Sequence, residues 1–341
     1  MDIRSRSRRV LVVGWGFLGA AVGNRMRDQG MEVTALTRSE STRTHAARLE
    51  GIDVDIGDAT DPGVLAHSMA GVDHVLCAAG GLLPAEAAEQ PHTDARGTLS
   101  PLLTILETLR RAPTAGLTYL SSGGTVYGNP PRVPARETDP VQPLSAYGVS
   151  RLAGELYAQM YARTYGFPVH ICRISNVYGP GQSPERSQGA VAVFLHRVAL
   201  GLPLQIIGDG SAIRDYIHIS DVADAVARIV AEGRDVGVVN IGSGRGSSVL
   251  GLARQVGTVI GTTPIIDFMP ARSHDVSAIV LDITKLRSLI EYEPMGLHEG
   301  LRLTWHHLIS SQLAADRLAP YEPVVTLAGR PFAFEKDEAA S

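Results

Sequence analysis

Short β-rich runs alternate with helical stretches through the first half of the chain, and this alternation leaves few possible architectures. Parallel strands need a long crossover connection, usually a helix, whereas antiparallel strands can be joined by a tight turn. Alternation of this kind therefore predicts a parallel sheet that is covered by helices on both faces. The expected strands are residues 10–14, 32–36, 52–56, 74–78, 117–121 and 169–173, with helices at 18–29, 97–111 and 146–165 among the connections.

A glycine motif follows the first expected strand. Residues 10–13 are apolar, and residues 14–19 read Gly-Trp-Gly-Phe-Leu-Gly before a helix begins. Glycines at 14, 16 and 19 let the backbone turn tightly and approach a pyrophosphate, which the helix N-terminus stabilises. In this position the motif predicts a dinucleotide site formed by Gly14, Gly16, Phe17, Leu18 and Gly19.

The ends of the next strands add candidate cofactor contacts. An acidic residue after the second strand would bind the ribose hydroxyls of NAD, but this chain has Arg38 there. Arg38 could hold the 2′-phosphate of NADP, stack on adenine or face solvent, so these residues leave NAD and NADP both open. Asp58, beside Ala59, is placed to receive the adenine amino group. Small residues after the fourth strand would let the chain pass close to the cofactor, and these are Ala78, Ala79 and Gly80.

Composition excludes several classes of partner. The formal net charge of −4 provides no global field that favours nucleic acid or an anionic membrane. No apolar stretch approaches the roughly 20 residues of a membrane span. Cys77 and Cys172 each lie in an apolar run, which argues against a disulfide scaffold and fits a reducing cytoplasm. The histidines have no metal-ligand spacing, so we predict no metal site.

We therefore predict an α/β fold, a Rossmann-type doubly wound parallel sheet with a smaller interleaved α/β substrate lobe. The less regular second half is expected to hold helices at 194–200, 221–232, 247–260 and 299–311 and a strand at 238–241. The dinucleotide-binding domain is predicted to comprise residues 1–176 and about 214–245. The smaller lobe would comprise about 177–213 and 246–313, followed by a C-terminal extension at 314–341.

Tyr147 and Arg151 are four residues apart, on one face of the expected helix. A cation in this position can lower the phenol's pKa from about 10, which makes tyrosine usable as a general base near neutrality. Alone, such a pair is more often a solvated surface pair. The surrounding motifs favour the catalytic interpretation.

Together, these features resemble the extended short-chain dehydrogenases, specifically the NAD-dependent nucleotide-sugar epimerase/dehydratase family. The resemblance runs from about residue 10 to residue 305 and rests on several blocks in family order. These blocks are residues 14–19, 119–128 (Tyr-Leu-Ser-Ser-Gly-Gly-Thr-Val-Tyr-Gly), 147–151, 173–181, 208–218, 240–244 and 272–276.

The resemblance implies roles for the catalytic residues. Tyr147 would deprotonate a sugar hydroxyl as hydride leaves the same carbon. Arg151 stands where the family has a lysine that bonds the nicotinamide ribose; arginine keeps the charge but is longer, forked and unable to lose a proton. The family's hydroxyl that shares the sugar's O4 proton falls on Gly123, so Ser122, Thr125 or a water must replace it.

The resemblance also implies ligand contacts away from the reacting carbon. Ile174 joins the cofactor side, and Gly123 and Gly124 line the sugar. Two arginines that converge on a diphosphate fit the preference of guanidinium for charge-assisted, bidentate bonds. The residues that align with contacts to the nucleotide diphosphate and ribose are Asn176, Arg214, Arg272 and Asp275.

The function implied is an NAD-dependent epimerase that inverts C4 of a nucleotide hexose or hexuronic acid, UDP-linked, through a transient 4-keto intermediate. A 4-keto reductase and a UDP-uronate decarboxylase stay open as alternatives, and so does a catalytically silent protein that binds dinucleotide or nucleotide sugar. A dehydratase is less favoured, because residues 123–125 lack the acid pair that elimination needs. The family implies a homodimer through helices 97–111 and 146–165.

Overall fold

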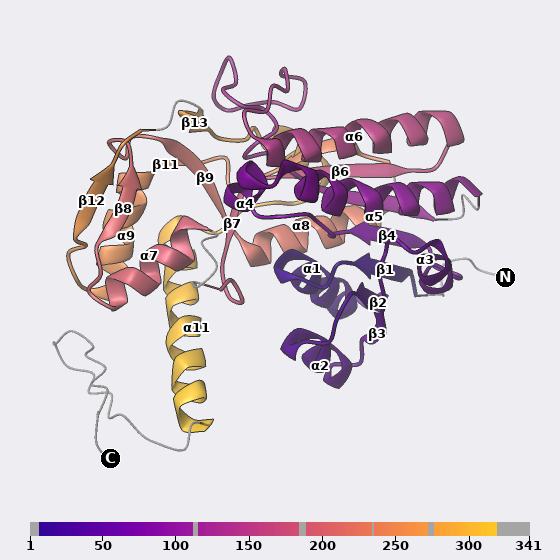
Figure 1. The fold of residues 1–341 in the computed structure, drawn as a ribbon, viewed down its shortest axis with the longest axis horizontal. Coiled ribbons are helices and arrows are strands. Elements are labelled where there is room, and N and C mark those ends of the chain that lie inside the picture. The colour runs from indigo at the N-terminus through magenta and orange to yellow at the C-terminus, as the bar shows by residue number, and fades with distance from the viewer. Residues whose placement is uncertain (1–6, 112–114, 184–188, 234, 272–275, 319–341) are drawn as a thin grey trace.

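A seven-stranded parallel sheet forms the centre of the structure (Figure 1). The structure is a computed structural model that describes residues 7–111, 115–183, 189–233, 235–271 and 276–318, and side-chain surroundings through residue 310. The strand order is β10-β6-β5-β4-β1-β2-β3, which confirms the predicted doubly wound arrangement. The strands are β1 (Arg9–Val13), β2 (Glu32–Thr37), β3 (Asp53–Ile56), β4 (His74–Cys77), β5 (Gly116–Ser122), β6 (Val169–Ile174) and β10 (Gly237–Ile241).

Helices cover both faces of this sheet, as its apolar strands require. In β1, Val10 and Val12 face one helical layer, and Leu11 and Val13 face the other. All four side chains are buried, which is why the strand has no polar alternation. The first layer contains α1 (Phe17–Asp28) and α8 (Ile219–Glu232), and the second contains α3 (Pro62–Ser68), α5 (Pro91–Arg111) and α6 (Ala146–Tyr165).

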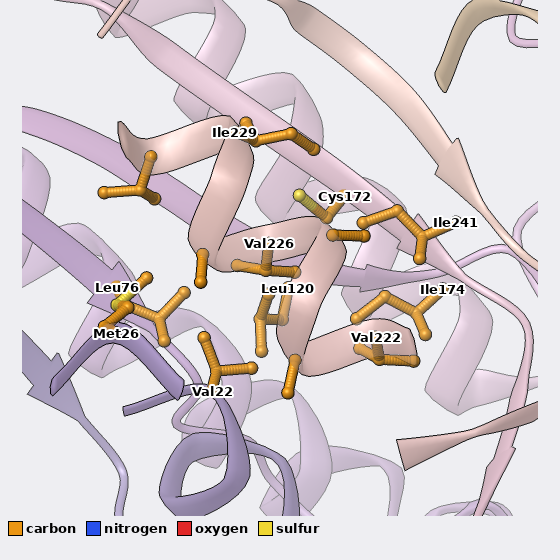
Figure 2. Close-up of a cluster of buried hydrophobic side chains, with 14 of the residues drawn as sticks. Val22, Met26, Leu76, Leu120, Cys172, Ile174, Val222, Val226, Ile229 and Ile241 are labelled. Atoms are coloured by element: carbon orange, nitrogen blue, oxygen red, sulfur yellow. The ribbon is translucent and has the colours of Figure 1, made fainter. Parts of the chain in front are cut away.

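Figure 2 shows the core under α8. Val222, Val226 and Ile229 point from this helix towards side chains of the sheet, which include Leu120 and Cys172. Burying an aliphatic side chain of this size contributes about 1.5–3 kcal/mol. This layer holds α8 against α1 and fixes the strands whose ends form the site.

Two smaller sheets lie beside the central one (Figure 1). One joins β7 (Asn176–Tyr178), β9 (Ile213–His218), β11 (Gly246–Ser248) and β13 (Ala278–Ile279). The other pairs β8 (Leu204–Ile207) with β12 (Ile266–Met269) in parallel. Helices that enclose their core are α7 (Ala190–Ala199), α9 (Val249–Ile260) and α11 (Leu297–Leu318).

Four short helices of the described chain were absent from the sequence prediction, and several predicted helices are longer than expected, most of all α5 and α11. The short ones are α2 (Thr42–Leu49), α4 (Pro84–Glu89), α10 (Thr284–Leu289) and α3. Helix α5 begins at Pro91, not at 97, because proline is tolerated in a first turn. Helix α11 continues to Leu318, past the predicted end at 311, through residues that favour helix.

Candidate active site

The glycine loop after β1 is shaped for a phosphate. Gly14 has a φ of 99°, and a β-carbon there would lie 2.6 Å from the backbone nitrogen of Ala79. A β-carbon at Gly19 would lie 1.9 Å from the carbonyl oxygen of Gly14. At Gly16, by contrast, it would meet no described atom within 4 Å. Gly14 and Gly19 therefore let backbone segments meet, while Gly16 leaves room for a ligand at the N-terminus of α1.

The remaining predicted cofactor residues lie at the carboxyl ends of neighbouring strands. Phe17 and Leu18 form the half-buried first turn of α1. The backbone of Ala78 donates to the carbonyl of Val13, which ties the end of β4 to the end of β1. Ile174 is buried at the end of β6. In doubly wound sheets, ligands bind along this edge.

Charged groups cluster near the ends of β2 and β3. The Thr60 backbone and hydroxyl donate to Asp58 and lower the pKa of its carboxyl, with a smaller contribution from the charge of Arg38. Arg38 is exposed. The first acidic residue after β2, Glu40, is held by Arg48, which lowers its pKa to about 2. The first carboxylate after β2 is thus engaged in a salt bridge with Arg48.

Tyr147 and Arg151 lie together at the beginning of α6. Ser145 caps this helix by accepting from the backbone of Gly148. The Arg151 guanidinium carbon lies 4.9 Å from the centroid of the Tyr147 ring, and Nη1 donates to the Leu120 carbonyl of β5 at 3.3 Å. Desolvation opposes the charge on Arg151, but the nearby tyrosine phenols outweigh it and hold its pKa above the ordinary value. Arg151 therefore remains a cation.

The two candidate hydroxyls lie on one turn after β5. Ser122 ends the strand, and the Thr125 hydroxyl donates to the Ser122 carbonyl over a long 3.4 Å. A β-carbon at Gly148 would lie 3.1 Å from the Thr125 carbonyl, so this turn packs against the helix that carries Tyr147. The structure thus brings Ser122 and Thr125 next to the first turn of α6.

Gly123 is required where it stands. A β-carbon there would lie 2.6 Å from Cδ1 of Leu281 and 3.0 Å from the Arg173 carbonyl. A side chain at position 123 would therefore clash with its packed surroundings. At Gly124, a β-carbon would have an ordinary 3.5 Å contact with the Asn176 amide.

The predicted contacts to the nucleotide diphosphate and ribose that the structure describes lie on β7 and β9. Asn176 donates to the Asp215 carbonyl at 3.2 Å, and Arg214 is half-buried one residue earlier on β9. Burial raises the pKa of Asp215, although hydrogen bonds from Ser243 oppose this shift. Arg272 and Asp275 lie outside the described residues.

The sequence prediction missed a buried polar network that holds α6 in place. Glu155 accepts from Arg173 through Nε and Nη2, the latter at 2.7 Å, and also from the Ser121 hydroxyl. Nη1 of Arg173 donates to Tyr127, whose hydroxyl donates to Asn240. The sequence contained one indication of this network. Glu155 follows Arg151 by four residues, so it lies on the same face of the helix as the candidate catalytic residues.

The described residues contain neither a cluster of metal ligands nor a membrane-spanning helix. Among them, no group of three or more histidine, cysteine, aspartate or glutamate side chains could hold a metal ion. None of the described helices has both the length and the apolar character that crossing a membrane requires.

Known proteins match most of the chain. It is 32% identical to a UDP-glucose 4-epimerase of Mycolicibacterium smegmatis, over 87% of this chain and 97% of that protein. It is 30% identical to a dTDP-4-dehydro-6-deoxy-D-allose reductase of Streptomyces bikiniensis, over 89% and 98% respectively. The structure of a Thermus thermophilus UDP-glucose 4-epimerase in complex with NAD superimposes with a TM-score of 0.81 at 32% identity, over 89% of this chain and 99% of that one. Residues 10–242 match the NAD dependent epimerase/dehydratase family, and the chain belongs to that family.

Proposed function

We propose that the protein is a nucleotide-sugar 4-epimerase that uses NAD and inverts C4 of a UDP-linked hexose or hexuronic acid. One observation carries the proposal. Gly14 of the phosphate loop abuts Ala79, and the next residue, Gly80, abuts the guanidinium of Arg151, which lies over the Tyr147 ring. The cofactor loop and the candidate base are therefore parts of one continuous site.

The residues present fit NAD. The open space at Gly16 and the N-terminus of α1, where no side-chain hydrogen bond caps the helix, suit the pyrophosphate. Asp58 would receive the adenine, and the loop at 78–80 would lie along the nicotinamide half. Bound NAD would supply a hydride acceptor that returns the hydride to the same carbon, so no external oxidant or reductant would be consumed.

Tyr147 would act as the general base towards the sugar's O4 hydroxyl. The positive charge of Arg151 stabilises the negative charge that the phenol oxygen must carry in that role. Ser122 or Thr125 would share the O4 proton in place of the family hydroxyl that Gly123 lacks. After the 4-keto sugar turns over in the site, Tyr147 would return the proton to O4.

The diphosphate and the nucleotide would be held on the side of β7 and β9. We assign this role to Asn176, Arg214, Arg272 and Asp275. Guanidinium groups suit a diphosphate because they form bidentate, charge-assisted bonds that a single ammonium does not. Residues 1–176 with about 214–245 would then bind the cofactor, and about 177–213 with 246–313 the nucleotide sugar.

A 4-keto reductase is the second candidate function. It is supported by Arg38, which lies after β2 where an acidic residue would otherwise bind the ribose of NAD, and by the reductase among the relatives. A reductase would consume free NADPH, whereas the proposed epimerase would retain its cofactor.

We further propose a cytoplasmic homodimer. Free thiols at Cys77 and Cys172 suit a reducing compartment. Helix α6, beside α5, exposes large apolar side chains along one face: Val149, Leu156, Tyr157 and Met160. A second copy packing on this face would bury them.

The first test is mass spectrometry of the supernatant after the purified protein is denatured. The proposal predicts NAD in near-stoichiometric amount. The native protein should also interconvert UDP-galactose with UDP-glucose, or UDP-galacturonic acid with UDP-glucuronic acid, without added cofactor. Bound NADP together with turnover that requires NADPH would support the reductase instead. Bound NAD without any interconversion would indicate a silent binding protein.

A further inference from the structure

Arg151 reaches across the site to the loop that follows β4. Its Nη1 donates to the Leu120 carbonyl on β5, and its Nη2 faces Gly80. No described residue accepts a hydrogen bond from its buried Nε. The guanidinium is held by the hydrogen bond to Leu120, by the hydroxyl of Tyr119, by the Tyr147 ring and by close packing against Gly80.

That space exists because residue 80 has no side chain. A β-carbon at Gly80 would lie 2.3 Å from Nη2 of Arg151, whereas ordinary contacts begin at 3.4 Å. Gly80 has no positive φ, so its backbone would accept alanine without strain. The arginine tip would have to move by about 1 Å, and a flexible side chain can do so without disturbing the fold.

This displacement of the Arg151 guanidinium would impair catalysis but would leave the fold intact. The guanidinium has a favourable position over the Tyr147 ring, and a displaced one would lose that contact and the hydrogen bond to Leu120. A lysine at 151 has no second terminal nitrogen and would not reach into the space at Gly80. The need for glycine at 80 is therefore specific to arginine at 151.

We propose that Gly80 is a positioning residue for the cation of this site. Its missing side chain lets the Arg151 guanidinium lie over Tyr147, so that arginine serves at a helix position where the related enzymes have lysine. This inference rests on the proposed function for the roles of Tyr147 and Arg151. The effect of Gly80 on the position of the guanidinium can be tested whether or not the protein is an epimerase.

The test is a double-mutant cycle of wild type, Gly80→Ala, Arg151→Lys and the double variant. Gly80→Ala should keep its melting temperature and lower kcat about tenfold or more. Its KM for the nucleotide sugar should stay nearly constant, and the acidic limb of its pH–rate profile should move to higher pH. In the Arg151→Lys background, the same alanine should lower kcat by a clearly smaller factor, because no guanidinium then occupies the space at Gly80. Gly296→Ala is the control for the glycine-to-alanine change itself, because a β-carbon at Gly296 would meet open space.

A crystal structure of Gly80→Ala supplies the readout that needs no turnover. The inference predicts that the Arg151 guanidinium has shifted by about 1 Å or more from its present position over the Tyr147 ring. An unmoved guanidinium overturns the inference, whether or not the protein proves to be an epimerase. An equal decrease in kcat in the wild-type and Arg151→Lys backgrounds also overturns the inference. Gly80 would then act on the bound cofactor and not through Arg151. If Gly80→Ala fails to fold, folding of the double variant supports the inference, and failure of both contradicts it.

Discussion

Tyr147 is the residue on which the proposed chemistry depends. It is half-buried in the first turn of α6, with the cation of Arg151 over its ring and the turn that carries Ser122 and Thr125 packed against the same end of the helix. These surroundings combine a candidate base, a fixed positive charge and nearby hydroxyls. No other part of the site offers a comparable group of proton-transfer residues close to the glycine loop in the described chain.

Tyr147→Phe should abolish turnover while the protein stays folded. Removing a positioned general base costs about 10² to 10⁴ in rate, and the ring that packs beside Arg151 is kept. The measurements are kcat and the amount of bound NAD. Tyr157→Phe, on the exposed face of the same helix, should leave both unchanged. Wild-type turnover in Tyr147→Phe would show that another group is the base.

At this scale, the spacing of Tyr147 and Arg151 predicted their contact, since residues four apart share a helix face. The sequence could not predict the space that the guanidinium needs, because Gly80 belongs to a loop 71 positions away, at the end of another strand. From the sequence, Gly123 could be recognised only as a position that lacks the hydroxyl expected from the family resemblance. Its packing against Leu281 depends on a distant segment, so it became visible only in the structure.

Among the elements, α6 must be fixed for Tyr147 to be placed, and the buried pair of Glu155 and Arg173 fixes it to β6. Glu155→Gln should leave the Arg173 charge without its counter-ion and reduce the free energy of unfolding by about 3–5 kcal/mol. Urea unfolding measures the change. Glu299→Gln breaks an exposed pair with Arg302 and should have no measurable effect. A similar result for both variants would mean that the buried network does not anchor the helix.

His218 caps helix α8 at its N-terminus, where its Nδ1 accepts from the Ser220 backbone. Burial lowers the pKa of His218 to about 4, below the value of about 6.5 for the unfolded chain. Below pH 6.5 the unfolded state therefore binds a proton that the folded state does not. The stability contributed by neutral His218 is complete above pH 6.5 and is lost as the pH falls towards 4.

This linkage predicts a specific pH dependence. His218→Asn keeps a side chain that caps helices but cannot titrate. Between pH 6.5 and 5 the wild type should lose about 1.6 kcal/mol more unfolding free energy than this variant, because the slope reaches its limit of about 1.4 kcal/mol per pH unit only well below the unfolded-state pKa. Urea unfolding at several pH values measures the difference, and His92→Asn, at an exposed site, should follow the wild type. Parallel curves for wild type and His218→Asn would contradict the assignment.

In the whole molecule, the exposed apolar face of α6 predicts a dimer. Leu156 is 57% exposed, and glutamate there would place a charge at the proposed interface. Light scattering should find a dimer for the wild type and a monomer for Leu156→Glu. Leu49→Glu, at a 76% exposed position on α2, should remain dimeric. A wild-type monomer, or a Leu156→Glu dimer, would exclude this face as the interface.

The central sheet could be predicted from the sequence because most of its strands are short β-rich runs that alternate with helices along the chain. All seven expected strands are present within two residues of their predicted bounds, from β1 to β10. The smaller sheets could not be predicted, since β11 and β13 have three and two residues. Strands this short carry too little periodicity, and their pairing with β9 depends on tertiary contacts.

The central claim is that hydride leaves and returns to one sugar carbon within a single protein. UDP-galactose, or UDP-galacturonic acid, carrying deuterium at C4 should be incubated with the purified protein and no added cofactor. Proton NMR should then find the C4 epimer with its deuterium retained at C4. Exchange of that deuterium for solvent hydrogen, or product only when NADPH is supplied and consumed, would contradict the account.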